Sequence, residues 1–99
     1  MKLYDLHYLP LEIASLQSAK ADCPEIADEL EQYRLQRVKE LDDLTAAVNG
    51  ISDPLIRAAV ILRGDRCLRW NDVAMRLGCP SADALRARVD RYLRDHPLV

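Results

Sequence analysis

Nine arginines lie in the second half of this 99-residue chain, and four of them fall within residues 86–94. A guanidinium group carries a permanent positive charge and five N–H donors, so it suits contacts with phosphates and with guanine edges in DNA. Residues 1–50 hold 5 Lys and Arg against 10 Asp and Glu, whereas residues 51–99 hold 9 against 6. The net charges of the two halves, −5 and +3, indicate a local anion-binding surface in the C-terminal half.

Two short amphipathic segments joined at a glycine lie among these arginines, in the stretch WNDVAMRLGCPSADAL at 70–85. Ala74 is a small residue where a second helix would cross the first, and Gly78 can adopt the positive φ of a tight turn. This combination predicts a helix-turn-helix. The spacing from Gly78 to Leu85 is one residue longer than is common, which predicts a longer turn.

The last helix of this motif is the expected reading helix for DNA. Its spacing turns Leu85, Val89 and Tyr92 inward. The side chains then expected to face base edges in a major groove are Ala82, Asp83, Arg86, Ala87 and Asp90. Arg86 is the best candidate reader because it can bind guanine N7 and O6 with two hydrogen bonds, while Asp83 would repel phosphate. Phosphate contacts are predicted for Arg69, Arg76, Arg88, Arg91 and Arg94.

The elements that must position this motif all read as helical, so we predict an all-α fold. An N-terminal helical hairpin arm is expected over 1–50, with helices at about 10–20 and 24–49. Pro10 suits the first turn of the former, and Asn49-Gly50 suits a left-handed end of the latter.

A three-helix module is expected over 51–99, and together with the arm it forms one compact domain. The first helix is capped by Ser52 or Asp53, has Pro54 at its first position and ends at Gly64. The second is capped by Asn71 or Asp72 and ends at Leu77. The third is capped by Ser81 and runs to about Asp95.

The sequence gives little support for metal binding, catalysis or insertion into a membrane. The three cysteines form no C-x-x-C pair and the two histidines lie near opposite ends, so we expect reduced, mostly buried thiols and no metal site. No nucleophile–base pair or phosphate-binding glycine loop is present, so we expect no enzyme, no catalytic residue and no cofactor. No apolar run is long enough to span a membrane, and a cytoplasmic protein is expected. Trp70 is interpreted as a lid on the core.

Residues 51–93 resemble the promoter-reading module (region four) of bacterial sigma factors, and more closely the small phage late-operon regulators of the ArpU and RinA kind. Those proteins share the pattern I-x-D-x-x-x-R-x-x-L-x-x-R-Y, a glycine-containing loop and S-W-x-x-I-A-x-x-L-G. The corresponding residues here are Ile51, Asp53, Arg57, Ile61, Trp70, Val73, Ala74, Leu77 and Gly78. The chain departs from the pattern at Gly64, which replaces the tyrosine, in the longer turn, and at Asp83. The resemblance implies sequence-specific binding to double-stranded DNA near phage promoters, with RNA polymerase as a further partner.

The sequence therefore favours a DNA-binding transcription regulator of phage or prophage origin. One alternative is a protein-binding module, such as a polymerase-associated factor or a phage-encoded inhibitor that uses its acidic arm. Its working residues would be Glu25, Asp28, Glu29 and Glu31. Another alternative is a DNA-packaging adaptor. A homodimer through the long helix at 24–49 also remains open.

Overall fold

The computed structural model describes residues 3–98, which form helices joined by turns. Their order is α1 (Asp5–Asp22), the 3-10 turn η1 (Pro24–Ile26), α2 (Ala27–Asn49), α3 (Pro54–Val60), the π-helical turn η2 (Ile61–Asp65), α4 (Trp70–Arg76) and α5 (Ala82–Asp95). No strand occurs within residues 3–98. The predicted all-α class is confirmed.

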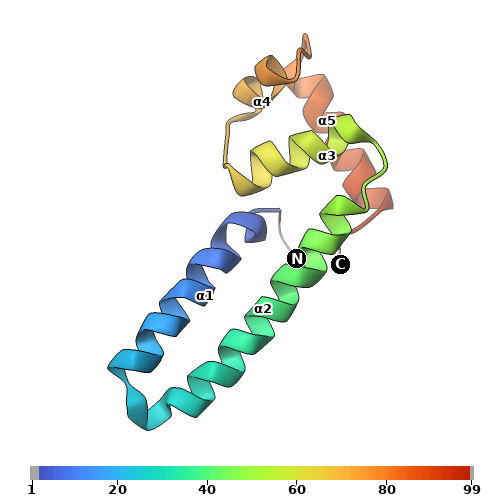
Figure 1. Ribbon diagram of the computed structural model, residues 1–99. Helices are drawn as coiled ribbons and strands as arrows, with labels where there is room; N and C mark the ends of the chain where they lie inside the picture. The colour runs from blue at the N-terminus through green and yellow to red at the C-terminus, as the bar shows by residue number, and fades with distance from the viewer. Residues whose placement is uncertain (1–2, 99) are drawn as a thin grey trace.

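Helices α1 and α2 lie side by side and antiparallel, and we call this pair the hairpin (Figure 1). Two ion pairs join the helices along its length. Lys20 Nζ lies 2.5 Å from Glu31 Oε2, and Arg37 Nε lies 3.2 Å from Glu12 Oε1. Because these charges sit where the helices meet, part of the hairpin contact is polar rather than apolar.

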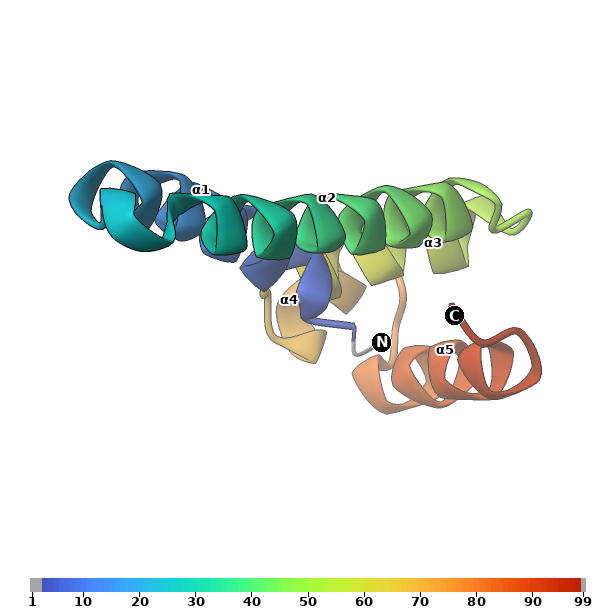
Figure 2. The same cartoon turned by 90° about the horizontal axis from the view of Figure 1, so that it is seen from below.

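The remaining helices, α3, η2, α4 and α5, form a second body that we call the C-terminal bundle. It packs against one face of the hairpin at one end, and the hairpin projects beyond it as a single layer (Figure 2). The molecule measures 54 × 24 × 16 Å, and its radius of gyration is 16.3 Å. A compact chain of this length has a radius of gyration of about 12.6 Å. The shape is therefore more extended than the compact domain expected.

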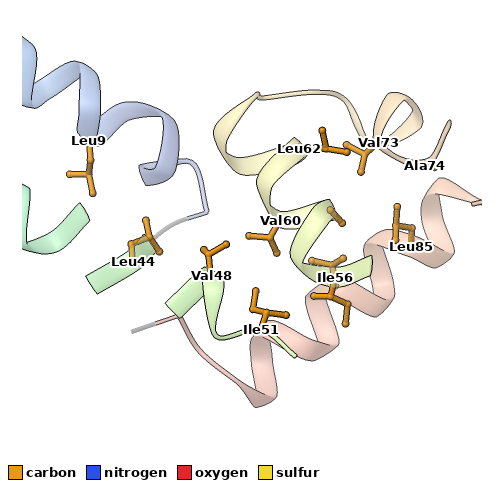
Figure 3. Packing of buried hydrophobic residues seen from close by; sticks show 12 residues of the cluster. Leu9, Leu44, Val48, Ile51, Ile56, Val60, Leu62, Val73, Ala74 and Leu85 are labelled. Atoms are coloured by element: carbon orange, nitrogen blue, oxygen red, sulfur yellow. The ribbon is translucent and has the colours of Figure 1, made fainter. Parts of the chain in front are cut away.

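One continuous hydrophobic core links the hairpin to α5 (Figure 3). Its buried residues are Leu9, Leu44, Val48, Ile51, Ile56, Ala59, Val60, Leu62, Val73, Ala74, Leu85 and Val89. Only three of these residues belong to the hairpin, and all three lie at the end next to the C-terminal bundle. Most apolar burial thus stabilises the bundle and the base of the hairpin, rather than the hairpin's far end.

The start of the first helix was predicted wrongly. It begins at Asp5, so Pro10 lies inside α1 rather than in its first turn. Proline removes one backbone hydrogen bond inside a helix. Here tertiary contacts compensate, because Leu9 is buried in the core and His7 Nδ1 lies 3.0 Å from the carbonyl oxygen of Asp65.

The turn between α2 and α3 differs from the prediction at one end and agrees at the other. Gly50 has φ −78°, so the expected left-handed end at Asn49-Gly50 is absent, and α2 ends with a bond from Gly50 N–H to Ala46 O. Of the two predicted caps, Ser52 and Asp53, the structure has Asp53 as the cap of α3. Its Oδ1 accepts from Leu55 N–H at 2.9 Å, and Pro54 is the first helical residue.

Gly64 does not end a helix, which corrects the sequence prediction. The chain continues from α3 into η2, and Gly64 is buried within it. A Cβ at Gly64 would lie 2.7 Å from the carbonyl oxygen of Leu3. The glycine is therefore required by the close approach of the N-terminal segment, not by a turn.

The helix before the glycine turn starts earlier than predicted. Its N-cap is Arg69, and no side chain caps it, so neither Asn71 nor Asp72 has the expected role. The last helix agrees with prediction, since Ser81 caps α5 and Asp95 is its final residue.

Candidate nucleic-acid interface

The turn after α4 is a hydrogen-bonded Schellman turn. Gly78 has φ +69°; its N–H donates to Met75 O at 3.3 Å, and Cys79 N–H donates to Ala74 O at 2.8 Å. These two bonds satisfy carbonyls that the helix end would leave without partners. The positive φ predicted for Gly78 is confirmed, and it fixes the direction in which the chain leaves α4.

The contact between α4 and α5 is closely packed. Val73 is fully buried and Ala74 is 4% exposed. Leu85 and Val89 of α5 are buried in the same core cluster. The small side chain of Ala74 lets the two helices approach closely at this point.

The N-terminus and inner face of α5 follow the prediction closely. Ser81 Oγ accepts a hydrogen bond from Ala84 N–H at 3.1 Å. Tyr92 is half-buried against the core, and its ring stacks on His96 with centroids 4.4 Å apart. The buried side of α5 therefore runs through Leu85, Val89 and Tyr92, and the other side faces away from the core.

Most of the predicted base-reading residues are exposed on α5, namely Asp83, Arg86, Ala87 and Asp90. Ala82 is instead half-buried and packs against the core. Arg86 Nε lies 3.7 Å from Asp90 Oδ2, and the two side chains are 62% and 56% exposed. An exposed pair of this kind is weak, so Arg86 can leave Asp90 for another anion.

Arg88 has a structural partner, which changes its predicted role. Its Nη2 lies 2.5 Å from Asp53 Oδ2, on the residue that caps α3. Partial burial raises the pKa of the Asp53 carboxyl, but two backbone N–H donors and the guanidinium outweigh it and hold this pKa below its usual value. Arg88 therefore ties α5 to α3 and is not free to bind a phosphate without breaking that link.

The other predicted phosphate contacts lie on exposed surface. These residues are Arg69, Arg76, Arg91 and Arg94. None of them forms an ion pair with another residue in the range 3–98. Four unpaired guanidinium groups on α4, α5 and the residue before α4 form the positive part of the candidate interface, and Asp83 and Asp90 lie among them.

Arg63 and Arg57 have structural roles that the sequence did not reveal. Arg63 donates from Nη1 to Leu68 O at 2.9 Å, and its guanidinium lies 5.1 Å from the Tyr4 ring centroid and 5.7 Å from that of Trp70. Trp70 is half-buried against the core, in agreement with the predicted lid. Arg57 donates from Nη1 to Ile51 O. Tyr4 is 59 residues from Arg63, and the backbone partners Leu68 and Ile51 lie at spacings that no helical period predicts, so the sequence alone does not identify them.

The acidic surface proposed for a protein partner is only partly free. Glu31 accepts hydrogen bonds from Arg34 and Lys20, and these bonds lower its pKa from 4.5 to about 2. Glu25, Asp28 and Glu29 are exposed near the distal end of the hairpin. Glu31 therefore differs from the other three residues, because its ion pair with Lys20 joins the two helices of the hairpin.

Residues 3–98 contain no cluster of three or more histidine, cysteine, aspartate and glutamate side chains that could hold a metal ion. The three cysteines are free and half-buried, less buried than expected. Among the helices of this described range, none has the length and apolar character needed to cross a membrane.

The chain matches no protein-family model, no curated protein and no solved structure.

Proposed function

We propose that this chain is a sequence-specific DNA-binding transcription regulator, with an N-terminal helical arm followed by a helix-turn-helix module. In this proposal α5 enters a major groove and α4 lies across the backbone. The resemblance to the sigma region-four-like regulators of phages supports the same function, and it adds RNA polymerase as a candidate partner.

The observation that carries the proposal is the exposed side of α5. The Schellman turn at Gly78 and the crossing at Ala74 hold α5 so that its apolar side is buried. Its opposite side is free and carries Arg86, Arg91 and Arg94, with Arg76 on the neighbouring helix. Phosphate contacts set the register of a protein on DNA, and a guanidinium in the groove can read guanine.

Two carboxylates on the exposed side of α5, those of Asp83 and Asp90, affect how this helix could bind DNA. Arg86 lies 3.7 Å from Asp90 in the free protein, so binding guanine replaces this weak ion pair with hydrogen bonds to a base. Asp83 lies near the N-terminus of α5, where it suits a cytosine amine and disfavours contact with phosphate. We therefore expect moderate affinity with strong dependence on the sequence bound.

The experiment is selection of bound sequences from random duplex DNA, carried out at two salt concentrations. A DNA reader will enrich one motif, and its affinity will fall steeply as salt rises, because phosphate contacts release counterions. The symmetry of the motif will report whether one or two modules bind. An Arg86→Ala variant serves as a control and should relax the preference at one base pair of the motif.

The absence of any retained DNA at low salt would contradict the proposal. Function would then move to the acidic end of the hairpin and a protein partner. The observation in favour of this second candidate is that Glu25, Asp28 and Glu29 are exposed and lie outside the Glu31 ion-pair network. A large ring in solution would instead favour a DNA-packaging adaptor.

A further inference from the structure

We infer that residues 3–7, which we call the strap, fix the position of α4 and that they act through Arg63. While the strap is docked, it holds residues 66–69, the connection between η2 and α4, in a strained conformation. Release of the strap lets the first turn of α4 move. The consequence for DNA rests on the proposed function, but the movement itself is measured without DNA.

The strap is docked on η2 at both of its ends. At one end, a Cβ added to Gly64 would lie 2.7 Å from the carbonyl oxygen of Leu3, so the two backbones are in close contact. At the other end, His7 Nδ1 lies 3.0 Å from the carbonyl oxygen of Asp65. Figure 1 shows the start of α1 beside the end of η2, which is drawn in yellow. The strap is therefore attached to the segment that leads into α4.

Arg63 links the strap to α4. Its guanidinium lies 5.1 Å from the centroid of the Tyr4 ring and 5.7 Å from that of Trp70, the first residue of α4. The same guanidinium donates from Nη1 to Leu68 O at 2.9 Å. One side chain thus contacts the strap, the connection and the start of α4. A cation is attracted to the face of an aromatic ring, so loss of the Tyr4 ring removes one of the attractions that hold Arg63 in place.

The connection and the turn before it have unusual backbone conformations. Within residues 3–98, Cys67 is the one residue other than glycine with a positive φ, at 56°. In η2, which is π-helical, Arg66 N–H donates to Ile61 O at 3.2 Å, five residues back. A positive φ is unfavourable for an L residue, and π-helical turns are rare and occur often at functional sites. Such conformations persist only where the surrounding structure enforces them.

The first turn of α4 has few other contacts to hold it. This helix has seven residues, of which Val73 and Ala74 are buried, and no side chain caps its N-terminus. A helix of this length is not stable by itself. Its second half is held by packing on α5, whereas its start is held by Trp70, which contacts the core and Arg63. We therefore expect release of the strap to move the start of α4 and to leave α5 in place.

A movement at the start of α4 would change the candidate interface. Arg69 directly precedes α4, and Arg91 and Arg94 lie on α5. Phosphate contacts set the register of a protein on DNA, which requires a fixed spacing between the groups that make them. The docked strap keeps Arg69 at a fixed distance from the arginines of α5, so it favours the form of the module that binds DNA.

The test is hydrogen exchange of the full chain without DNA, with Tyr4→Ala compared with wild type. Exchange should become about tenfold faster in residues 66–73, as expected for loss of one partly buried cation–π contact, and should change little in α3 and α5. Trp70 is the only tryptophan of the chain, so its fluorescence gives a second measure, and its emission should shift in this variant. Tyr4→Phe keeps the ring and should behave as wild type. Unchanged exchange and emission in Tyr4→Ala would overturn the inference.

Tyr33→Ala is the matched control, because it also removes a tyrosine ring from an arginine. The Arg37 guanidinium lies 4.7 Å from the Tyr33 ring centroid, and both residues lie in the first half of α2. This variant loosens the hairpin and leaves the strap unchanged, so residues 66–73 should exchange as in wild type. Circular dichroism will check that the variants keep their helical content. Equal acceleration in the two alanine variants, or equal acceleration of α3, α4 and α5 in Tyr4→Ala, would show a general loss of stability and overturn the inference.

Arg63→Met tests whether the strap acts through Arg63. Methionine lacks the cation and the hydrogen bond to Leu68 O, so residues 66–73 should exchange faster in this variant too. Adding Tyr4→Ala to Arg63→Met should then cause little further change, because side chains in one contact are not additive. Fully additive effects would overturn the route through Arg63.

Binding to DNA separates this inference from the proposed function. If both hold, Tyr4→Ala should weaken binding to the selected sequence and keep the same sequence preference. Faster exchange in Tyr4→Ala, together with no DNA binding by the wild type, would support the strap and contradict the proposed function. Unchanged exchange in a protein that binds DNA would overturn the strap alone.

Discussion

The guanidinium of Arg88 lies 2.5 Å from a carboxylate oxygen of Asp53, although the two residues are 35 positions apart. The other oxygen of this carboxylate caps α3, at 2.9 Å from Leu55 N. One side chain therefore fixes the N-terminus of α3 and holds α5 beside it. The contact therefore opposes motions that carry the N-terminus of α3 away from α5.

Asp53→Asn should separate the two roles of this carboxylate. Asparagine still caps the helix, so the variant loses the ion pair and keeps the cap, whereas Asp53→Ala loses both. Chemical denaturation should rank the free energies of unfolding as wild type, then Asp53→Asn, then Asp53→Ala. Adding Arg88→Gln to Asp53→Asn should cost little more, since partners in one contact are not additive. Fully additive losses would show that the pair contributes nothing.

Gly78→Ala should destabilise the protein by about 1–2 kcal/mol, because an L side chain at positive φ is strained even though no atom lies within 4 Å of the added Cβ. Gly50→Ala is the matched control. Gly50 has φ −78° and room for a Cβ, so alanine there should be neutral or slightly stabilising. Thermal unfolding of both variants measures the difference. A loss of stability at Gly50 equal to that at Gly78 would contradict the explanation.

Gly64→Ala should separate the N-terminal segment from η2. The new Cβ would meet the Leu3 carbonyl oxygen at 2.7 Å, so the backbone of one of the two segments must move. We expect a loss of about 1–3 kcal/mol, as for other overpacked sites. Hydrogen exchange should show faster exchange at the first turns of α1 and little change in α5. Unchanged protection of α1 would show that the close approach is easily relaxed.

Acid should weaken the hairpin through Glu31. The Arg34 and Lys20 hydrogen bonds lower the pKa of Glu31 from 4.5 to about 2, so protons bind more tightly in the unfolded chain. The contribution of Glu31 is complete above pH 4.5 and disappears as the pH falls toward 2. The difference in unfolding free energy between wild type and Glu31→Gln should therefore shrink over this range. Glu29→Gln, at an exposed position outside the ion pairs, should show no such trend.

If α5 reads DNA, Arg86→Ala should change the sequence preference of binding, whereas Arg91→Ala should change only its affinity. Loss of Arg86 should cost about 1–3 kcal/mol on the selected sequence and relax the preference at one base pair. Loss of Arg91 should weaken binding evenly across sequences and reduce the salt slope by about one. Equal loss on all sequences for Arg86→Ala would remove its role as reader.

Asp90→Asn offers a complementary test of the same face. It removes a negative charge and releases Arg86 from the pair at 3.7 Å. Binding to DNA should become tighter, and the binding measurements used for the arginine variants apply unchanged. Weaker binding would mean that Asp90 itself contacts a base.

Local signals in the sequence predicted two helix caps and one of the three glycine positions correctly. Ser81 is predicted as the cap of α5, Ser52 or Asp53 as the cap of α3, and Gly78 as a residue of positive φ, because each role depends on a few neighbouring residues. The inward side of α5 followed from helical spacing alone. The all-α class rested on the same kind of information.

Errors arose where distant contacts outweigh local preference. Pro10 lies inside α1 because Leu9 and His7 are held by the C-terminal bundle. Gly64 lies inside η2, and its role is to leave room for the carbonyl oxygen of Leu3, which is 61 positions away in sequence. Arg88 was assigned to phosphate because Asp53 is remote in sequence, and no spacing rule connects them.

The sequence by itself determined the helical class, the cap of α5, the turn at Gly78 and the concentration of arginines in the C-terminal half. These features depend on backbone preference, helical period and composition. Only the tertiary structure decided which arginines remain free, since ion pairs such as Arg88 with Asp53 form between segments that fold together. It also decided that the hairpin projects as one layer, because packing at the base buries Leu9, Leu44 and Val48 and nothing beyond.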